Sequence, residues 1–323
     1  MISSIGFIPN TSDIKELKAF VPDETIQKKL SYLQIPILNP EEPADSDIVD
    51  EGNNAEDKNY IKETDSIVFS TPNTEEMSYC SIYGYDEEEM FFHHDFFVFS
   101  TILDSTYLGN NLIALATFEP DVLVYDFLTK FPVLPQHLLC GHESFVTSIK
   151  NKENKIVSSS DDKSIIEWDL NTFGIKSQNF YDVSIERFDF EGKSLAFAQK
   201  NYLCINNENF SLDYDIEQLK IRGDKVYATD AQGYVSIYDM RNLEKKLFSK
   251  KIHDAAAVDI LILEECIVTS SLDGTVKFWD TNFDIKDTKE QESPIYCLGY
   301  NPYSSYNEIF GGSENDQVIP IKL

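Results

Sequence analysis

Two stretches of this chain repeat one another and decide its fold: residues 142–169, HESFVTSIKNKENKIVSSSDDKSIIEWD, and residues 253–280, HDAAAVDILILEECIVTSSLDGTVKFWD. They align without gaps, and each runs from a histidine through a cluster of hydroxyl side chains and a turn aspartate to Trp-Asp. The matched residues are His142, Asp162, Trp168 and Asp169 in the first copy and His253, Asp273, Trp279 and Asp280 in the second. Self-similarity of this kind indicates a repeat architecture.

Weaker copies of the same frame lie on both sides of these two. Residues 111–126 end on Tyr-Asp, residues 195–207 end on Asn-Asn, residues 226–239 end on Tyr-Asp, and the last copy, GGSENDQVIPIKL, ends at residue 323. The end markers fall at 126, 169, 207, 239, 280 and about 322. Their mean spacing of roughly 40 residues is the period of four-stranded propeller blades.

The unit that begins at Gly141 and ends at Asp169 resembles a WD40 repeat. The resemblance implies that Trp168 lies in the third strand of a blade, with a strand-two hydroxyl, the turn Asp162 and the leading His142 joined by hydrogen bonds behind it. A buried indole N–H and a buried imidazole both need partners, so these residue types occur together.

From residue 66 onward, short runs rich in Val, Ile, Tyr and Phe recur between turn residues, and periodic segments of helical length are absent. Together with the repeat, they predict an all-β, seven-bladed WD40 β-propeller over residues 66–323. The last copy ends after its third strand. We therefore expect the apolar residues 1–9 to supply the missing strand of that last blade and close the ring, because an open edge would otherwise be exposed. A partial propeller completed by a partner is the alternative.

Residues 10–65 differ from the rest in composition and predict a flexible acidic linker. Between residues 41 and 65 stand ten acids and only two lysines, a composition that cannot bury a core. Residues 22–33, PDETIQKKLSYL, have a helix-start signal and place Ile26, Leu30 and Leu33 at helical spacing, which predicts one short helix. The acidic run is either simply solvated or a tail that wraps a basic partner.

The charge of the whole chain limits the partners it can have. Its 56 Asp+Glu against 27 Lys+Arg give a formal net charge of −29. That excludes a general basic coat for nucleic acid, because each phosphate contact needs a Lys or Arg. One local basic island remains a candidate RNA- or partner-binding site, with a solvated loop as its alternative. The island consists of Arg241, Lys245, Lys246, Lys250 and Lys251.

Cysteine usage and hydropathy predict the compartment. The five cysteines are dispersed and form no CxxC pair, which argues against a disulfide framework or a zinc knuckle and favours a reducing, intracellular setting. No apolar run reaches the length of about 18 residues that a membrane span needs, and residues 1–10 do not have the pattern of a signal peptide. We expect a soluble intracellular protein.

Three features suggest chemistry but do not predict an enzyme. His93-His94-Asp95 is not expected to bind a metal, because adjacent residues on a strand face opposite sides; we expect His94-Asp95 to open the second blade instead. His142, Asp162 and the nearby serines list the members of a hydrolase triad, but in this repeat the hydroxyl is a buried bridge. No phosphate-binding glycine loop is present. We expect no catalysis, no metal and no cofactor.

The N-terminal half carries motifs more specific than the WD40 repeat in general. They are Met-Ile-Ser at residues 1–3 followed by Pro9, His93-His94-Asp95, and residues 116–120, ATFEP, before Val-Tyr-Asp at 124–126. Together they resemble the periodic tryptophan protein 1 family. The resemblance implies a nucleolar WD40 propeller, monomeric within a large complex, that acts in ribosome biogenesis on the large-subunit precursor and contacts assembly factors and ribosomal proteins.

Two departures from that family concern RNA. Members usually carry a lysine-rich insertion between blades two and three, where this chain has only residues 129–141, and a charged C-terminal extension that is not found here. We therefore expect a non-enzymatic scaffold whose contact with precursor rRNA depends on the basic island. The alternative is an acidic chaperone or chromatin-associated WD40 protein that binds histones or other basic proteins. An adaptor in ubiquitin or signalling complexes would rest on the fold alone.

Overall fold

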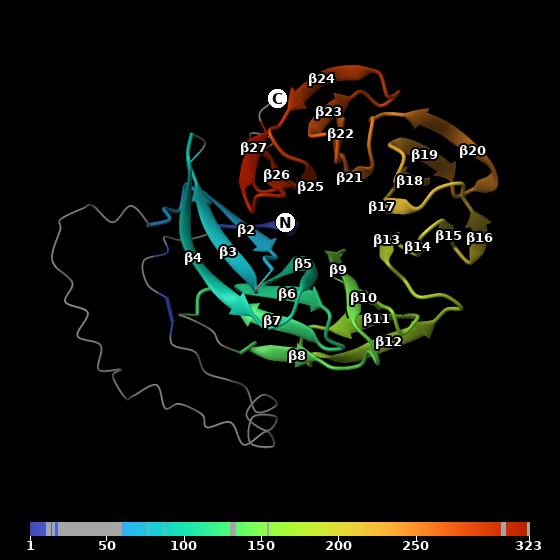
Figure 1. The fold of residues 1–323 in the computed structure, drawn as a ribbon. Helices are drawn as coiled ribbons and strands as arrows, with labels where there is room; N and C mark the ends of the chain where they lie inside the picture. The colour runs from blue at the N-terminus through green and yellow to red at the C-terminus, as the bar shows by residue number, and fades with distance from the viewer. Residues whose placement is uncertain are drawn as a thin grey trace, which may run out of the picture.

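The computed structural model describes residues 1–10, 14, 17–18, 60–75, 77–86, 88–129, 134–153, 155–304 and 308–321. Strands are the regular elements of this part, and they form seven small sheets arranged in a ring (Figure 1). The all-β, seven-bladed propeller expected from the repeat is confirmed. The predicted helix at residues 22–33 lies outside the described residues. Among the described residues, no helix has the length and apolarity to cross a membrane.

The first three blades are numbered along the chain, and each has four antiparallel strands. Blade one consists of β1 (Ile2–Ile8), β2 (Ser66–Pro72), β3 (Ser78–Tyr85) and β4 (Met90–Val98). Blade two consists of β5 (Ile102–Gly109), β6 (Leu112–Thr117), β7 (Val122–Asp126) and β8 (His137–Leu139). Blade three consists of β9 (Val146–Lys152), β10 (Lys155–Ser160), β11 (Ser164–Asp169) and β12 (Gly174–Phe180).

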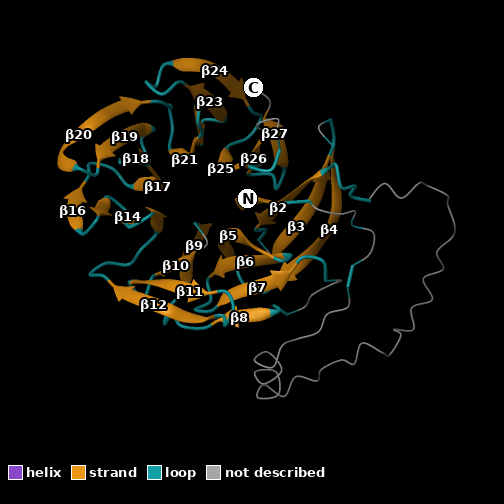
Figure 2. Cartoon of the chain, turned by 180° about the vertical axis from the view of Figure 1, so that it is seen from behind, coloured by secondary structure: helices purple, strands orange, loops and turns teal. Residues whose placement is uncertain are grey.

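The remaining four blades complete the ring (Figure 2). Blade four consists of β13 (Arg187–Glu191), β14 (Ser194–Gln199), β15 (Tyr202–Ile205) and β16 (Glu208–Ser211). Blade five consists of β17 (Ile216–Arg222), β18 (Lys225–Asp230), β19 (Tyr234–Asp239) and β20 (Asn242–Lys251). Blade six consists of β21 (Ala257–Ile262), β22 (Ile267–Ser271), β23 (Thr275–Trp279) and β24 (Ile285–Glu290). Blade seven consists of β25 (Ile295–Tyr300), β26 (Ile309–Ser313) and β27 (Val318–Ile321).

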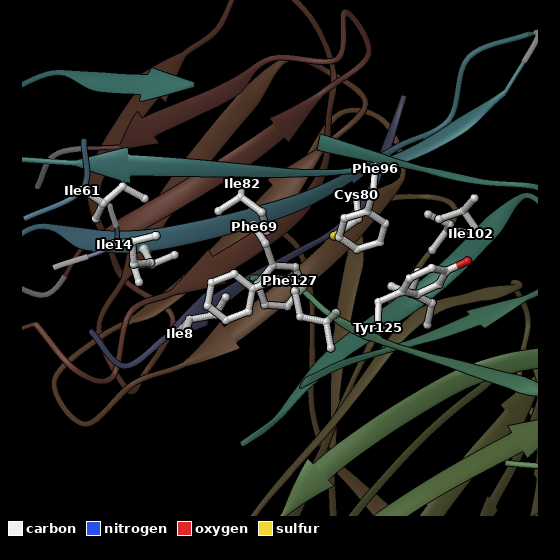
Figure 3. Packing of buried hydrophobic residues seen from close by; sticks show 14 residues of the cluster. Ile8, Ile14, Ile61, Phe69, Cys80, Ile82, Phe96, Ile102, Tyr125 and Phe127 are labelled. Atoms are coloured by element: carbon white, nitrogen blue, oxygen red, sulfur yellow. The ribbon is translucent and has the colours of Figure 1, made fainter. Parts of the chain in front are cut away.

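The hydrophobic core lies between the blades, because each sheet packs its two faces against its two neighbours. Second strands such as β10 and β22 are therefore buried on both faces and read as runs of apolar and small residues. The seam between blades one and two shows the arrangement: Phe96 of the outer strand β4 packs on Tyr125 of the third strand β7, with ring centroids 4.7 Å apart (Figure 3). The outer strand of one blade covers the third strand of the next.

Three inner strands also hold the ring together through aspartates. Each carboxylate accepts the backbone N–H of a residue on the inner strand of the following blade, which satisfies an amide that faces the channel. The pairs are Asp104 with Ile149 at 3.1 Å, Asp189 with Ile221 at 2.7 Å and Asp259 with Leu298 at 2.8 Å. These hydrogen bonds therefore link blade two to blade three, blade four to blade five, and blade six to blade seven.

The N-terminal strand closes the ring in a different way from the one we expected. Residues 1–9 do not complete the last blade: β1 pairs with β2, with Phe7 opposite Val68, as the innermost strand of blade one, and β25–β27 stay a three-stranded sheet. The prediction correctly ended the last repeat after its third strand, but it began the first blade at residue 66. Because β2 is instead a second strand, blade one itself needs residues 2–8.

Blades seven and one are joined by packing rather than by a shared sheet. Ile2 and Phe7 lie in one buried cluster with Cys297 and Phe310 of blade seven, and the Cys297 Sγ lies 3.6 Å from the Ile2 carbonyl oxygen. Gly312 makes the close approach possible, since a Cβ there would stand 2.6 Å from the Cys297 Sγ and 2.8 Å from Ile2 Cγ2. Side-chain fit therefore closes this ring.

The two ends of the predicted linker pack on the propeller. Ile14 and Ile61 form an antiparallel bridge and belong to the buried cluster between blades one and two (Figure 3). The Lys18 N–H donates to the Leu128 carbonyl at 2.6 Å, and Asn10 donates to the Lys62 carbonyl. The linker expected over residues 10–65 is therefore anchored through Asn10, Ile14 and Lys18 at one end and residues 60–65 at the other, where Ile14 and Ile61 pack into a seam.

Candidate functional site

The residues of the first strong repeat form one hydrogen-bonded chain. The Trp168 Nε1–H donates to the Ser158 Oγ at 2.8 Å, the Ser158 hydroxyl meets His142 Nε2 at 2.8 Å, and His142 Nδ1 meets Asp162 Oδ2 at 3.0 Å. Asp162 also accepts the Glu143 N–H at 2.8 Å. Every polar atom of the buried imidazole and indole thus has a partner.

The second strong repeat has the same geometry. The Trp279 Nε1–H donates to Thr269 Oγ1 at 2.9 Å, which lies 2.7 Å from His253 Nε2, and His253 Nδ1 lies 3.2 Å from Asp273 Oδ2. Asp273 also accepts the Thr275 N–H and hydroxyl. The bridging hydroxyl is the first of its cluster in both copies, Ser158 or Thr269.

Burial favours the neutral form of the two histidines. Burial lowers the pKa of His253 to about 4 against the opposing effect of Asp273, and burial likewise lowers the pKa of His142. Burial alone would raise the pKa of Asp273, but its hydrogen bonds from Thr275 and Asp254 bring it down to about 2. A neutral imidazole donates from Nδ1 to a carboxylate and accepts at Nε2 from a hydroxyl that is itself buried. The arrangement is a structural brace, with no free nucleophile.

The Asp of each Trp-Asp pair lies apart from that brace. Asp169 Oδ1 accepts the Asn171 N–H at 2.8 Å, and Asp280 Oδ1 accepts the N–H groups of Asn282 and Asp284 at 2.8 and 2.9 Å. Both carboxylates therefore cap the turn that leads from the third strand to the outer one.

The structure corrects two expectations at His93 and His94. Both residues belong to β4, the outer strand of blade one, and do not open blade two. A register shift between Ile82 and Tyr83 breaks the alternation, so the two side chains do not point apart: their Nδ1 atoms lie 2.6 Å from each other. His94 Nε2 meets the Phe127 carbonyl at 2.7 Å, and burial lowers the pKa of His94 to about 4. This pair braces the seam between blades one and two.

The basic island lies along β20 and the turn before it, and its charges do not act together. Arg241 is paired with Asp239 at 2.8 Å and with Asp224 at 3.2 Å. Lys250 Nζ donates to the Phe283 carbonyl at 2.6 Å and lies 5.6 Å from the Trp279 ring centroid. Lys246 is exposed beside the Tyr238 ring, and Lys251 is also exposed. The side chain of Lys245 lies outside the described part of the chain.

A second surface, which the repeat pattern did not indicate, surrounds one mouth of the central channel. The loops that enter the inner strands of blades three to seven meet there, and each carries an acid while none carries a Lys or Arg. These acids include Glu143, Asp182, Asp213, Asp254 and Glu292. Such one-signed loops on a rigid frame make a field that attracts cations.

A cavity of about 490 Å³ opens at this mouth. Its lining includes Phe118 and Phe145, whose rings lie 5.3 Å apart and edge to face. Three acids, Glu186, Asp215 and Glu217, and two bases, Arg187 and Lys200, also line it. Phe118 is 55% exposed. Aromatic rings beside carboxylates form a pocket suited to an apolar or cationic side chain.

Glu217 is the carboxyl group of this cavity whose pKa is raised. Burial raises the pKa of Glu217 against the effect of Arg187, and the like charges of Asp215, Asp230 and Glu186 add to the rise. The Arg187 guanidinium is itself bonded to the Glu186 and Glu217 carbonyls. A carboxyl cluster with a perturbed pKa in a cleft is a candidate binding site. No group of three or more His, Cys, Asp or Glu within the described ranges is arranged to hold a metal ion.

Comparisons with known proteins agree with this geometry. Residues 134–169 and 252–280, which hold both hydrogen-bonded braces, match the family described as WD domain, G-beta repeat. The chain is 23% identical over 274 residues to an uncharacterized WD repeat-containing protein of Schizosaccharomyces pombe. The alignment covers 69% of this chain and 53% of that protein, so the chain spans about half the length of the curated relative it matches.

Among solved structures, the WD40 β-propeller domain of Doa1 has a similar fold. The TM-score is 0.67 at 16% sequence identity, and the match covers 78% of this chain and 87% of that domain. The chain therefore contains WD40 repeats and folds as a seven-bladed WD40 propeller.

Proposed function

We propose that this protein is a scaffold in the assembly of the large ribosomal subunit and holds basic partner proteins on the acidic face around the channel mouth. One observation carries the proposal: Glu186, Asp215 and Glu217 cluster beside Phe118 and Phe145 in an open cavity. Lysine and arginine side chains suit such a site, since they relieve carboxylate repulsion and stack on aromatic rings. Ribosomal proteins carry these residues in order to bind rRNA phosphates.

The choice of pathway rests on the motifs at residues 1–9, 93–95 and 116–126 that resemble the periodic tryptophan protein 1 family. That resemblance supports a nucleolar location and pre-ribosomal assembly factors as partners. We assign contact with precursor rRNA to the basic island, where Lys246 and Lys251 are exposed while Arg241 is already paired with two carboxylates. In this proposal the acidic face binds proteins, and the exposed lysines at the rim bind RNA.

The test neutralises the carboxyl cluster without changing its shape. The triple variant Glu186→Gln, Asp215→Asn, Glu217→Gln should lose most of its co-sedimentation with large-subunit precursors and its co-purification with basic ribosomal proteins. The matched control is Glu264→Gln, Glu265→Gln, two exposed acids in the β21–β22 loop at the opposite end of the propeller. Unchanged sedimentation of the triple variant would remove the acidic face from the proposal.

An acidic chaperone for histones is the second candidate, and the ten acids of residues 41–65 favour it. Deleting residues 41–58 tests it while keeping Ile61, which is buried against the propeller. Loss of histone capture, together with purification of histones without precursor rRNA, would establish the chaperone. Intact sedimentation after that deletion, with precursor rRNA recovered by sequencing of the bound RNA, would establish the ribosomal scaffold.

A further inference from the structure

An outer strand packs into four of the inter-blade seams: one–two, two–three, four–five and five–six. In the seam between blades five and six, Phe248 of β20 packs on Phe283, with ring centroids 5.2 Å apart, and Lys250 lies over Trp279. Trp279 is consequently only 4% exposed. In the seam between blades two and three, Leu139 of β8 belongs to the buried cluster that contains Trp168. In these seams the outer strand therefore buries the third strand of the next blade away from solvent.

Among the described residues, blade seven has three strands, and β27 is the edge strand of its sheet. The Ser313 N–H donates to the Gln317 carbonyl, so residues 317, 319 and 321 direct their backbone groups to β26. By alternation, Val318 and Pro320 direct theirs outward. The edge thus offers the N–H and C=O of Val318 and the C=O of Pro320, while proline limits indiscriminate pairing.

The face of blade one that an outer strand would cover is aromatic. Tyr79 pairs with Phe97, ring centroids 5.2 Å apart, and Tyr83 pairs with Phe92, 5.9 Å apart. Phe97 is 52% and Phe92 46% exposed. Tyr83 packs against the buried cluster that contains Val318, which places this face beside β27. Exposed rings in a row of this kind mark an interaction surface.

One carboxylate stands in the aromatic row. Asp95 lies on the same face of β4 as Phe92 and Phe97, opposite Ser81, and burial raises its pKa. The described residues of the turns at the two ends of the seam, 86–89 and 314–317, carry acids and no base. These acids are Asp86, Glu88, Glu89, Glu314 and Asp316. Asp316 is paired with the Met1 ammonium group, so the negative charge around this edge comes from the other four acids and Asp95.

We propose that the open seam between blades seven and one is a strand-acceptor site for an extended basic segment of a partner protein. The segment pairs with the outward groups of Val318 and Pro320, lays alternate apolar side chains on Tyr79, Phe97 and Phe92, and brings a Lys or Arg to Asp95. Main-chain hydrogen bonds give the affinity in this mode of recognition, and alternate side chains give the specificity.

The probe is a blocked ten-residue peptide of alternating valine and lysine, added to the full-length protein. Its affinity is measured by fluorescence anisotropy, and hydrogen exchange of the Val318 amide is followed by NMR. We expect the Val318 amide to become protected, and Asp95→Lys and Phe97→Ser each to weaken binding about tenfold, by loss of a charge pair or an aromatic anchor. The matched control is Ile285→Ser on β24, an equally exposed residue (57%) on an outer strand whose blade is complete.

Three results would overturn the proposal. A peptide with five lysines followed by five valines should bind at least about tenfold more weakly; equal binding would mean simple charge attraction. Unchanged affinity in Asp95→Lys would place the peptide elsewhere. The third result concerns the free protein. The Val318 amide could be protected from exchange without peptide and lose that protection when a Gly-Ser stretch of equal length replaces residues 19–58. The seam would then be occupied by the chain itself. The anchors Lys18 and Ile61 are kept in that variant.

Discussion

The seam between blades five and six and the seam between blades seven and one solve the same packing problem by different means. In the first, an outer strand lies over Trp279, and His253, Thr269 and Asp273 provide partners for the indole and imidazole nitrogens. In the second, the seam is closed by the fit of β1 against glycines of blade seven, and within the described part of the chain no outer strand lies over it. A closed seam stabilises the ring, and an open seam leaves apolar surface for a partner.

The largest expected difference between the two seams is the cost of removing an aromatic ring. Trp279→Ala creates a cavity and leaves the Thr269 hydroxyl without its indole donor, which should lower the free energy of unfolding by about 4 kcal/mol. Phe97→Ala removes a half-exposed ring from the open seam and should cost less than about 1 kcal/mol. Urea denaturation followed by circular dichroism compares them. Equal costs would show that the open seam is covered in solution.

The histidine brace makes the closed seam sensitive to acid. Below pH 6.5 the unfolded chain takes up a proton at residue 253, whereas folded His253 stays neutral until about pH 4. The stabilisation that neutral His253 gives the folded state is therefore fully present above pH 6.5 and is lost as the pH falls toward 4. Unfolding free energy measured in urea should be about 2 kcal/mol lower at pH 5.0 than at pH 7.5 from this residue alone.

His253→Gln is the control for that pH dependence. Glutamine cannot titrate, so the variant should be less stable at pH 7.5 but should lose less stability between pH 7.5 and 5.0 than the parent protein does. His142 has a pKa lowered in the same direction and keeps part of the slope in the variant. An identical slope in both proteins would show that the imidazole is not the titrating group.

At the open seam, the close approach of β1 should tolerate no added methyl group. Gly312→Ala brings a Cβ to 2.6 Å from the Cys297 Sγ and 2.8 Å from Ile2, and we expect a loss of about 1.5 kcal/mol. Faster hydrogen exchange in residues 2–8 should accompany it, because β1 must move away. Gly174→Ala is the control, since only the flexible Thr172 side chain approaches within 3.2 Å.

The sequence predicted the closed seams far better than the open one. His142, Asp162 and Trp168 are specified by a gapless repeat, because the brace is built from local residues that must all be present for any of them to be buried. The position of β1 depends on where blade one begins, and its weak repeat gives no marker for that. The prediction therefore misplaced one strand. It put residues 1–9 at the outer edge of the last blade, whereas they form the innermost strand of blade one.

The acidic cavity escaped prediction for a related reason. Phe118, Glu186 and Asp215 lie in loops of different blades and are brought together only by closure of the ring. Each looks like an ordinary exposed residue in its own repeat. The signal that was present in the sequence is the absence of Lys and Arg from the loops before β9, β13, β17, β21 and β25, which becomes meaningful once those loops are known to share a face.

The smallest expected effect separates a structural lysine from the rest of the basic island. Lys250 belongs to the closed seam: its amine donates to the Phe283 carbonyl and lies over the Trp279 ring, so Lys250→Ala should cost about 1 kcal/mol of unfolding free energy. Lys251→Ala, one position along the exposed edge of β20, should change stability by less than about 0.3 kcal/mol. If the island serves RNA, recovery of precursor rRNA should follow Lys246 and Lys251 rather than Lys250. If only Lys250→Ala lowered the recovery of precursor rRNA, the correct packing of β20 would be required for the RNA-bound complex and the positive charge of the island would not.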